Sequence, residues 1–143
     1  MDFLFFLTFI ESYKDCIINN TINGIKYFKF YTHKILLSEQ SEYFKSINTA
    51  DSNLYLEKKT NEIVLTNVDY ISFYHILYYC YYGTFPNEDN YNIYDYISIV
   101  MEASRFIFND IIDYCEKRLS KIITKSNAHE IFEFAKVTNR LKI

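Results

Sequence analysis

The sequence predicts an α+β fold, in which a small mixed sheet, made of a hairpin and short strands, is capped by a cluster of α-helices. Asn23-Gly24 stands between two runs of β-forming residues, which is a strong local signal for a hairpin. After residue 34 most apolar residues recur at helical spacing, interrupted by a short strand-like run at 62–65. The predicted order is therefore helix, hairpin, helix, strand and further helices.

The length and composition fit one domain, or one domain with a short appendage. The chain has 143 residues, and half of them are hydrophobic, which is enough for a sizeable core. Two Gly and one Pro argue against linkers and low-complexity tails. The abundance of Ile, Asn, Lys, Tyr and Phe is interpreted first as codon usage in an AT-rich genome, such as that of a protist or a large DNA virus. Individual tyrosines therefore carry little information by themselves.

Charge and cysteine usage indicate an intracellular protein that does not bind nucleic acid. The net charge is -3 and the Lys and Arg residues are scattered, so a basic footprint is missing. The three cysteines are odd in number and fall in apolar runs, which is typical of buried thiols in a reducing compartment. The apolar N-terminal run has no positive region before it and is too short to span a bilayer. We expect a cytoplasmic or nuclear protein with no membrane partner.

The first helix is predicted from aromatic spacing. Phe5, Phe6, Phe9 and Ile10 recur with helical periodicity, and Tyr13 continues the stripe. Two interpretations stay open, because the stripe fits an ordinary core as well as a contact surface for a partner.

The pattern changes from strand to helix at His33 and Lys34. The second hairpin strand covers about residues 25–32, and one helix is predicted from Lys34 to Ile47. The following residues, 48–61, are polar and irregular except for one apolar island, Leu54-Tyr55-Leu56.

Four helices are predicted in the second half. The first starts after Asp69 as the N-cap and ends at Gly83. The next two cover about 93–108 and 110–123, and the last begins near 126–130, with Asn127 or Ser126 as cap and Glu130 at capping-box spacing. The residues expected to face inwards are Phe73, Ile76, Leu77, Cys80, Tyr81, Ile97, Val100, Met101, Ile112, Cys115, Leu119, Ile122, Ala128, Ile131 and Ala135.

No residue pattern indicates catalysis. His33, His75 and His129 are not at metal-ligand spacing from one another, and no cysteine has an evident base. Two glycines cannot build a phosphate loop. We therefore expect no enzyme activity, no metal and no cofactor. The acidic pair Glu88-Asp89 is interpreted as a solvated turn.

Three stretches together resemble the BTB/POZ family. "HKILLSEQSEYFKSI" is similar to its segment of His, basic residue, apolar pair and Ser-x-x-Phe. "EIVLTNVDYISFYHILYYCYYGTFP" is similar to its strand, its next helix start and its aromatic-Tyr-x-Gly ending. The stretch from Val100 to Ile143 resembles the helices that follow and then the opening of a BACK-type segment. The resemblance divides the chain into a BTB/POZ domain at 1–123 and the first part of a BACK-like extension at 124–143.

The resemblance implies a structural histidine and a dimer interface. His33 would pack between the hairpin and the second helix, and Lys34 would lie beside the dimer interface, close to Asp15. Such a charge pair gives specificity more than stability, and a lysine cannot form a bidentate pair. The residues assigned to the homodimer interface are Phe5, Phe6, Phe9, Asp15, Lys34 and Leu37.

Many adaptors of the BTB family, which this sequence resembles, carry an apolar-x-Glu motif that helps to hold the cullin of an E3 ubiquitin ligase. Tyr55-x-Glu57 matches this motif, in a loop that is longer than usual and has Asn48 in place of a typical aromatic residue. A chance match in a flexible loop is the alternative. The residues assigned to cullin binding are Tyr55, Glu57, Tyr81, Tyr82 and Tyr114.

Three functions follow from the resemblance. The first is a homodimeric cullin-3 adaptor for an unknown substrate protein. The second is an interfering protein that dimerises with other BTB proteins without recruiting a ligase. The third is a monomeric Skp1-like member, against which the long aromatic first helix argues.

Overall fold

The computed structural model describes residues 16–22, 25–49, 62–122, 124–125 and 127–138. The chain divides into two compact units, Met1–Ile71 and Ser72–Ile143. The predicted first helix lies outside the described residues, and so does most of the loop at 48–61.

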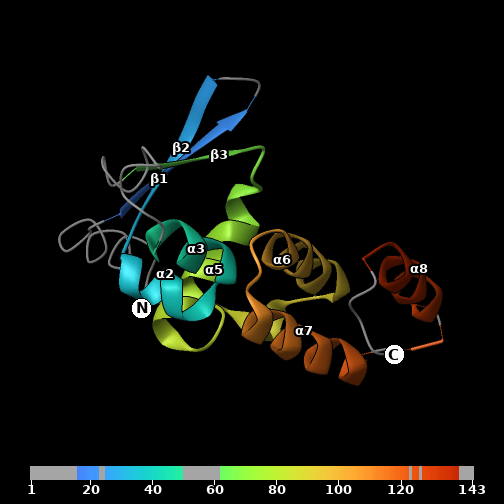
Figure 1. Cartoon of the computed structure of the whole chain (residues 1–143). Coiled ribbons are helices and arrows are strands. Elements are labelled where there is room, and N and C mark those ends of the chain that lie inside the picture. Colours follow the sequence, from blue (N-terminus) through green and yellow to red (C-terminus); the bar gives the residue numbers. More distant parts are fainter. Residues whose placement is uncertain (1–15, 23–24, 50–61, 123, 126, 139–143) are drawn as a thin grey trace. The chain divides into compact units, whose positions relative to one another are not determined.

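A three-stranded mixed sheet forms the first unit's β-structure (Figure 1). Strands β1 (Cys16–Ile22) and β2 (Ile25–Thr32) are antiparallel, which confirms the predicted hairpin. Strand β3 (Glu62–Thr66) is parallel to β1, so the order is β2-β1-β3 with β1 in the centre. The α+β class is confirmed.

One face of this sheet is apolar and buried. Ile18 of β1 is opposite Phe30 on β2 and Ile63 on β3, and all three side chains are buried. On β3, buried Ile63 and Leu65 alternate with exposed Val64 and Thr66, as the period of two in a strand requires. The sheet thus contributes one layer of the core.

The predicted helix from Lys34 to Ile47 is wrong as a single element. It is divided into α2 (Lys34–Gln40) and α3 (Glu42–Thr49), and Ser41 between them is extended (φ -130°, ψ 121°). The Ser41 hydroxyl accepts a hydrogen bond from the backbone N–H of Phe44 at 3.1 Å, so Ser41 caps α3. Apolar periodicity continues through the break and does not reveal it.

Helix α5 (Tyr70–Tyr82) has the predicted limits. It begins directly after Asp69 and ends at Gly83, whose φ of +75° is the left-handed conformation that suits glycine. The Gly83 N–H donates to the Tyr79 carbonyl at 2.8 Å. In the segment of α5 that belongs to the second unit, four side chains are buried as predicted: Phe73, Ile76, Leu77 and Cys80.

Helices α6 (Ile93–Arg105) and α7 (Asn109–Ile122) pack against each other in the second unit (Figure 1). Asn92 and Asp95 form a reciprocal capping box at the start of α6. Helix α6 ends earlier than predicted, because Ile107 adopts a φ of +55° and the Phe108 N–H donates to the Ala103 carbonyl at 2.9 Å.

Two residues expected to face inwards are exposed. Met101 on α6 keeps 56% of its surface and Ile122 on α7 keeps 36%. Met101 lies on the side of α6 that faces away from its buried residues, and Ile122 is the last residue of α7. Val100, Ile112, Cys115 and Leu119 are buried as expected.

Helix α8 (Ala128–Thr138) starts where it was predicted, and Ile131 on it is buried. The Asn127 side chain bonds backwards: its Oδ1 accepts from the Thr124 N–H at 2.7 Å and its Nδ2 donates to the Ile122 carbonyl at 3.2 Å. Asn127 thus closes the turn between α7 and α8. On α8 itself, the Glu130 carboxylate accepts a hydrogen bond from the Tyr94 hydroxyl at 2.6 Å.

Candidate functional site

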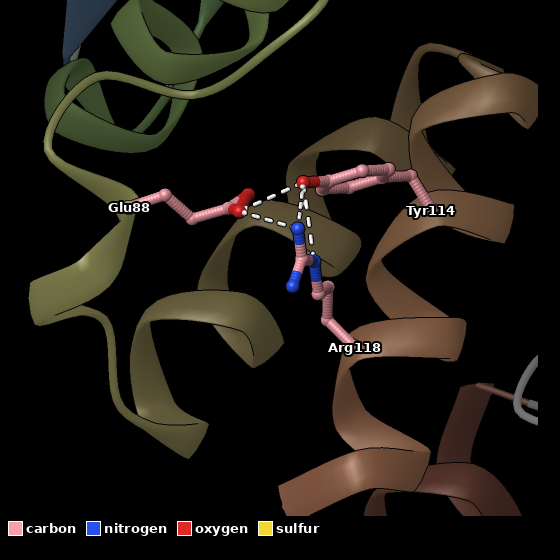
Figure 2. Close-up of polar contacts among 3 residues, drawn as sticks. All are labelled: Glu88, Tyr114 and Arg118. Carbon is pink, nitrogen blue, oxygen red and sulfur yellow. Dashed lines mark hydrogen bonds and ion pairs between the residues drawn. The ribbon is translucent and has the colours of Figure 1, made fainter.

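A polar network joins the turn after α5 to helix α7. Glu88 lies on the short 3₁₀ helix η1 (Glu88–Asn90), and Tyr114 and Arg118 are four residues apart on α7. Figure 2 shows these three side chains converging. The Tyr114 hydroxyl donates to Glu88 Oε2 at 2.7 Å, and an Arg118 guanidinium nitrogen lies 3.5 Å from the same oxygen. We call this set the Glu88 network.

The Tyr114 hydroxyl uses its full hydrogen-bonding capacity in the Glu88 network. It accepts from Arg118 Nε at 3.2 Å and from Arg118 Nη2 at 3.0 Å while it donates to Glu88. The Arg118 guanidinium carbon also lies 5.2 Å from the Tyr114 ring centroid, within cation–π range. Burial and the hydrogen bond to Glu88 raise the pKa of Tyr114, and the hydrogen bond to Tyr114 raises the pKa of Arg118.

The prediction of a solvated turn at Glu88-Asp89 is wrong for Glu88. The Glu88 side chain is only 15% exposed, whereas Asp89 is exposed as predicted. A carboxylate removed from water needs donors, and Tyr114 and Arg118 supply them. The partners stand 26 and 30 positions along the chain from Glu88, so local sequence gives no sign of the pairing.

An aromatic cluster lies beside the Glu88 network. Tyr79 on α5 and Phe85 in the following turn contact each other and Tyr114, with ring centroids 5.0–5.6 Å apart. Tyr91 continues the cluster from Phe85 (5.9 Å) to Tyr96 on α6 (5.5 Å). Offset and edge contacts of this kind add to apolar burial. The turn between α5 and α6 is therefore held by rings as well as by polar bonds.

Two buried polar atoms in this region have no hydrogen-bond partner within the described structure: Glu88 Oε1 and the Tyr91 hydroxyl. Burial is the main cause that raises the pKa of Tyr91, with the Glu88 charge adding to it. Burial likewise raises the pKa of Tyr96 to about 12. Both phenols therefore stay protonated at neutral pH.

The buried thiols do not have the character of nucleophiles. Burial raises the pKa of Cys80 to about 12, and it also raises the pKa of Cys115. A cysteine reacts as its thiolate, so both side chains are chemically quiet at neutral pH. Among the described residues, no group of three His, Cys, Asp or Glu side chains is placed to hold a metal ion. Within the same residues, every helix is too short or too polar to cross a membrane.

Comparison with known proteins assigns the family. The family model of the BTB/POZ domain matches residues 12–123. The chain belongs to the BTB/POZ family. Domains of this family are protein-interaction modules, so the surfaces described above are candidates for binding another protein.

The BTB/POZ chain has relatives among longer proteins. It is 29% identical over 104 residues to Kelch-like protein 15 of chicken, a match that covers 72% of this chain and 20% of the relative. Kelch-like protein 15 of human matches equally well, with 16% of its length covered. The chain thus spans a fifth or less of these relatives. The BTB domain of zebrafish PATZ1 has the same fold, with a TM-score of 0.52, 17% identity, and coverage of 74% of this chain and 76% of that chain.

Only three of the five residues predicted to bind cullin lie within the part of the chain that the structure describes. Tyr55 and Glu57 lie outside the described residues. At the end of α5, Tyr81 is half-buried, and Tyr82 is 37% exposed and contacts the Tyr78 ring at 4.6 Å. Tyr114 is half-buried in the Glu88 network, where it contacts Tyr79 of α5. Tyr82 offers the most surface of the three.

Sequence reasoning missed the residues that hold Tyr114 in place. Tyr79 and Phe85 pack on its ring, and Glu88 and Arg118 bind its hydroxyl. The spacing of four between Tyr114 and Arg118 on one helix was a detectable signal for that pair. Nothing local connects either of them to Glu88.

The residues predicted for the dimer interface are also partly placed. Phe5, Phe6, Phe9 and Asp15 lie outside the described residues, and Lys34 is half-buried at the start of α2. Leu37 is completely buried within the single chain.

His33 immediately precedes α2, and its carbonyl accepts the Leu37 N–H at 3.2 Å. The side chain was expected to be buried, but it is half-buried.

Proposed function

We propose that this BTB/POZ chain is a homodimeric adaptor, which binds a cullin-3-type scaffold of an E3 ubiquitin ligase and presents a substrate protein to it. The family match over residues 12–123 is the observation that carries the proposal. The similarity to Kelch-like protein 15 supports it. In this role the protein acts by binding rather than by catalysis, in the cytoplasm or nucleus, without a cofactor and without nucleic acid or membrane partners.

The proposed cullin surface combines Tyr55 and Glu57 with the end of α5 and with α7. Tyr82 supplies an exposed aromatic side chain, the type that often carries much of an interface's binding energy. The Glu88 network and the ring of Phe85 hold the turn after α5 against α7. A surface that is already ordered loses less entropy when it binds, which favours a stable contact.

The homodimer is proposed to form through the first helix, with Phe5, Phe6 and Phe9 facing the partner and Asp15 and Lys34 near the interface. Phe6→Asp combined with Phe9→Asp should give a monomer or an insoluble protein, because two carboxylates cannot be buried without partners. Light scattering measures the mass directly. A wild-type monomer at micromolar concentration would contradict the homodimer.

Cullin binding is tested by calorimetry with an N-terminal cullin-3 fragment. Tyr55→Ala should weaken binding by about 2 kcal/mol and Glu57→Ala by about 1 kcal/mol, since an aromatic anchor contributes more than a rim charge. Tyr82→Ala should also weaken binding. Met101→Ala is the matched control, because it truncates a large exposed side chain on α6, outside the proposed surface.

The calorimetric result separates the adaptor from the alternative function. If the wild type does not bind at tens of micromolar, the adaptor proposal fails and the interfering dimer, which pairs with other BTB proteins, takes its place. If the wild type binds and Tyr55→Ala has no effect, the motif assignment at 55–57 is wrong while the adaptor stands.

The residues after the BTB/POZ match are proposed to begin a BACK-like extension at 124–143. Helix α8 lies in this segment, and its Glu130 accepts a hydrogen bond from Tyr94 on α6. The extension would add contacts to a bound cullin.

A further inference from the structure

Helix α7 has an outward face made of charged residues. Its apolar residues Ile111, Ile112, Cys115 and Leu119 are buried. At 3.6 residues per turn the opposite side of the helix carries four exposed charged residues. These are Asp110, Asp113, Lys117 and Lys121.

The charges of this face are separated along the helix. The two acids stand in the N-terminal half and the two lysines in the C-terminal half, an arrangement that also suits the helix dipole. Asp113 and Lys117 have the spacing and order that favour an intrahelical pair. In the described structure, however, Asp110, Asp113, Lys117 and Lys121 take part in neither the Arg105–Glu102 ion pair nor the Arg118–Glu88 ion pair. Their charges are therefore open to a partner.

The order of the charges makes the face complementary to itself. If a second α7 runs antiparallel across it with a two-fold axis between Cys115 and Glu116, position 110 faces position 121. The same operation brings Asp113 opposite position 118, one residue from Lys117. Each acidic half then meets a basic half, and every contact is made twice, as an isologous interface requires.

We propose that α7 mediates self-association of this chain by pairing antiparallel with α7 of a second copy, through Asp110 and Asp113 on one helix and Lys121 and Lys117 on the other. The occupant of this face is a second copy because the complementarity is internal to one helix. A wholly acidic or wholly basic partner would match only half of it.

The contact is small and polar, so it is weak and transient. It is distinct from the homodimer interface proposed for the first helix, but it lies on the helix that the proposed cullin surface also includes, so a second copy and a bound cullin would compete for α7. A chain with two different isologous interfaces links dimers into larger assemblies, whereas a chain with the α7 contact alone stops at a dimer.

The test uses two variants with opposite charge changes. Lys117→Glu with Lys121→Glu makes the face acidic, and Asp110→Lys with Asp113→Lys makes it basic. The assay is sedimentation velocity at several protein concentrations, in low and high NaCl. Between 0.02 and 0.5 M salt the screening length falls from roughly 20 Å to roughly 4 Å, which should weaken an interface of exposed charges.

We expect the weight-average sedimentation coefficient of the wild type to fall as salt rises. Each variant alone should sediment more slowly than the wild type at low salt, because its face repels itself. An equimolar mixture of the two variants should regain the wild-type value, since an acidic face then meets a basic one. Glu39→Lys with Glu133→Lys is the control, because it changes net charge as the basic variant does but leaves α7 intact, and it should keep the wild-type behaviour.

Two further variants guard against misfolding. They remove the charges without reversing them: one is Lys117→Gln with Lys121→Gln, and the other is Asp110→Asn with Asp113→Asn. In each, the sedimentation coefficient should no longer fall as salt rises. A wild-type coefficient that is independent of salt, or a mixture that sediments as the average of its components, overturns the α7 contact. Repeating the assay on the Phe6→Asp, Phe9→Asp protein, where soluble, separates the two interfaces, because this protein should be monomeric at high salt and should still self-associate through α7 at low salt.

Discussion

Tyr114 and Tyr94 provide a matched pair for measuring how much the Glu88 network contributes to stability. Each hydroxyl donates to a glutamate, at 2.7 Å for Tyr114 to Glu88 and at 2.6 Å for Tyr94 to Glu130. The two bonds are alike in geometry but differ in environment. Tyr114 is half-buried and its partner is 15% exposed, whereas Tyr94 and Glu130 are exposed.

Tyr114→Phe should lower the free energy of unfolding by about 1.5 kcal/mol. A hydrogen bond to a charged group contributes about 1.5–3 kcal/mol, and the remaining exposure and the ion pair to Arg118 place this bond at the lower end. For a chain of this size the loss corresponds to a fall in Tm of about 5 °C. Tyr94→Phe should leave stability unchanged within error, because water replaces the lost partner of an exposed carboxylate.

Urea unfolding gives the free energies, provided that the slope with denaturant is the same for all variants. A double-mutant cycle with Glu88→Gln isolates the pair, and the coupling between positions 88 and 114 should be about 1 kcal/mol. Equal effects of Tyr114→Phe and Tyr94→Phe, or a coupling near zero, would refute the reasoning. The turn after α5 would then be held mainly by the ring contacts of the aromatic cluster.

Three other predictions concern the backbone, alkaline pH and His33. Ile107 has a strained φ of +55°, which asparagine adopts more easily, so Ile107→Asn should raise the free energy of unfolding by about 0.5–1 kcal/mol, as measured by urea unfolding. Ile122 is equally exposed (36%) but lies in a helix, so the control Ile122→Asn should lower the free energy of unfolding. Burial raises the pKa of Tyr91, and it raises the pKa of Tyr96 to about 12. The unfolded chain therefore loses these protons more easily than the folded chain, so stability should be intact below pH 10 and should fall between about pH 10 and 12. Tyr91→Phe should make this fall in Tm with pH less steep. His33→Ala should cost about 1 kcal/mol, near the lower limit for a partner left unsatisfied, and an unchanged melting curve would contradict a structural role.

Local sequence signals predicted much of the fold. Asn23-Gly24 marked the hairpin of β1 and β2, and Asp69 and Gly83 marked both ends of α5. Each signal acts through the dihedral angles or hydrogen bonds of a few neighbouring residues, so no tertiary information is needed to interpret it. The joint order of such elements was also sufficient to indicate the BTB/POZ family, which the family model confirms.

The site was less predictable than the fold. Tyr114 was selected from the sequence, but its contacts with Glu88, Phe85 and Tyr79 join segments that periodicity treats separately. The interpretation of Glu88 as a solvated residue failed because an acid beside a turn is usually exposed, and only packing against α7 removes it from water.

The sequence by itself determined where most strands and helices begin and end, because caps, turn residues and apolar spacing act over a few residues. Tertiary structure decided the break at Ser41, the exposure of Met101 and the left-handed turn at Ile107. In each case the local preference was weak or opposed to the outcome. At Ser41 and Ile107 the hydrogen bonds that accompany the outcome are themselves local, from the Phe44 N–H to the Ser41 hydroxyl and from the Phe108 N–H to the Ala103 carbonyl, but apolar spacing does not predict them and only the folded backbone reveals them.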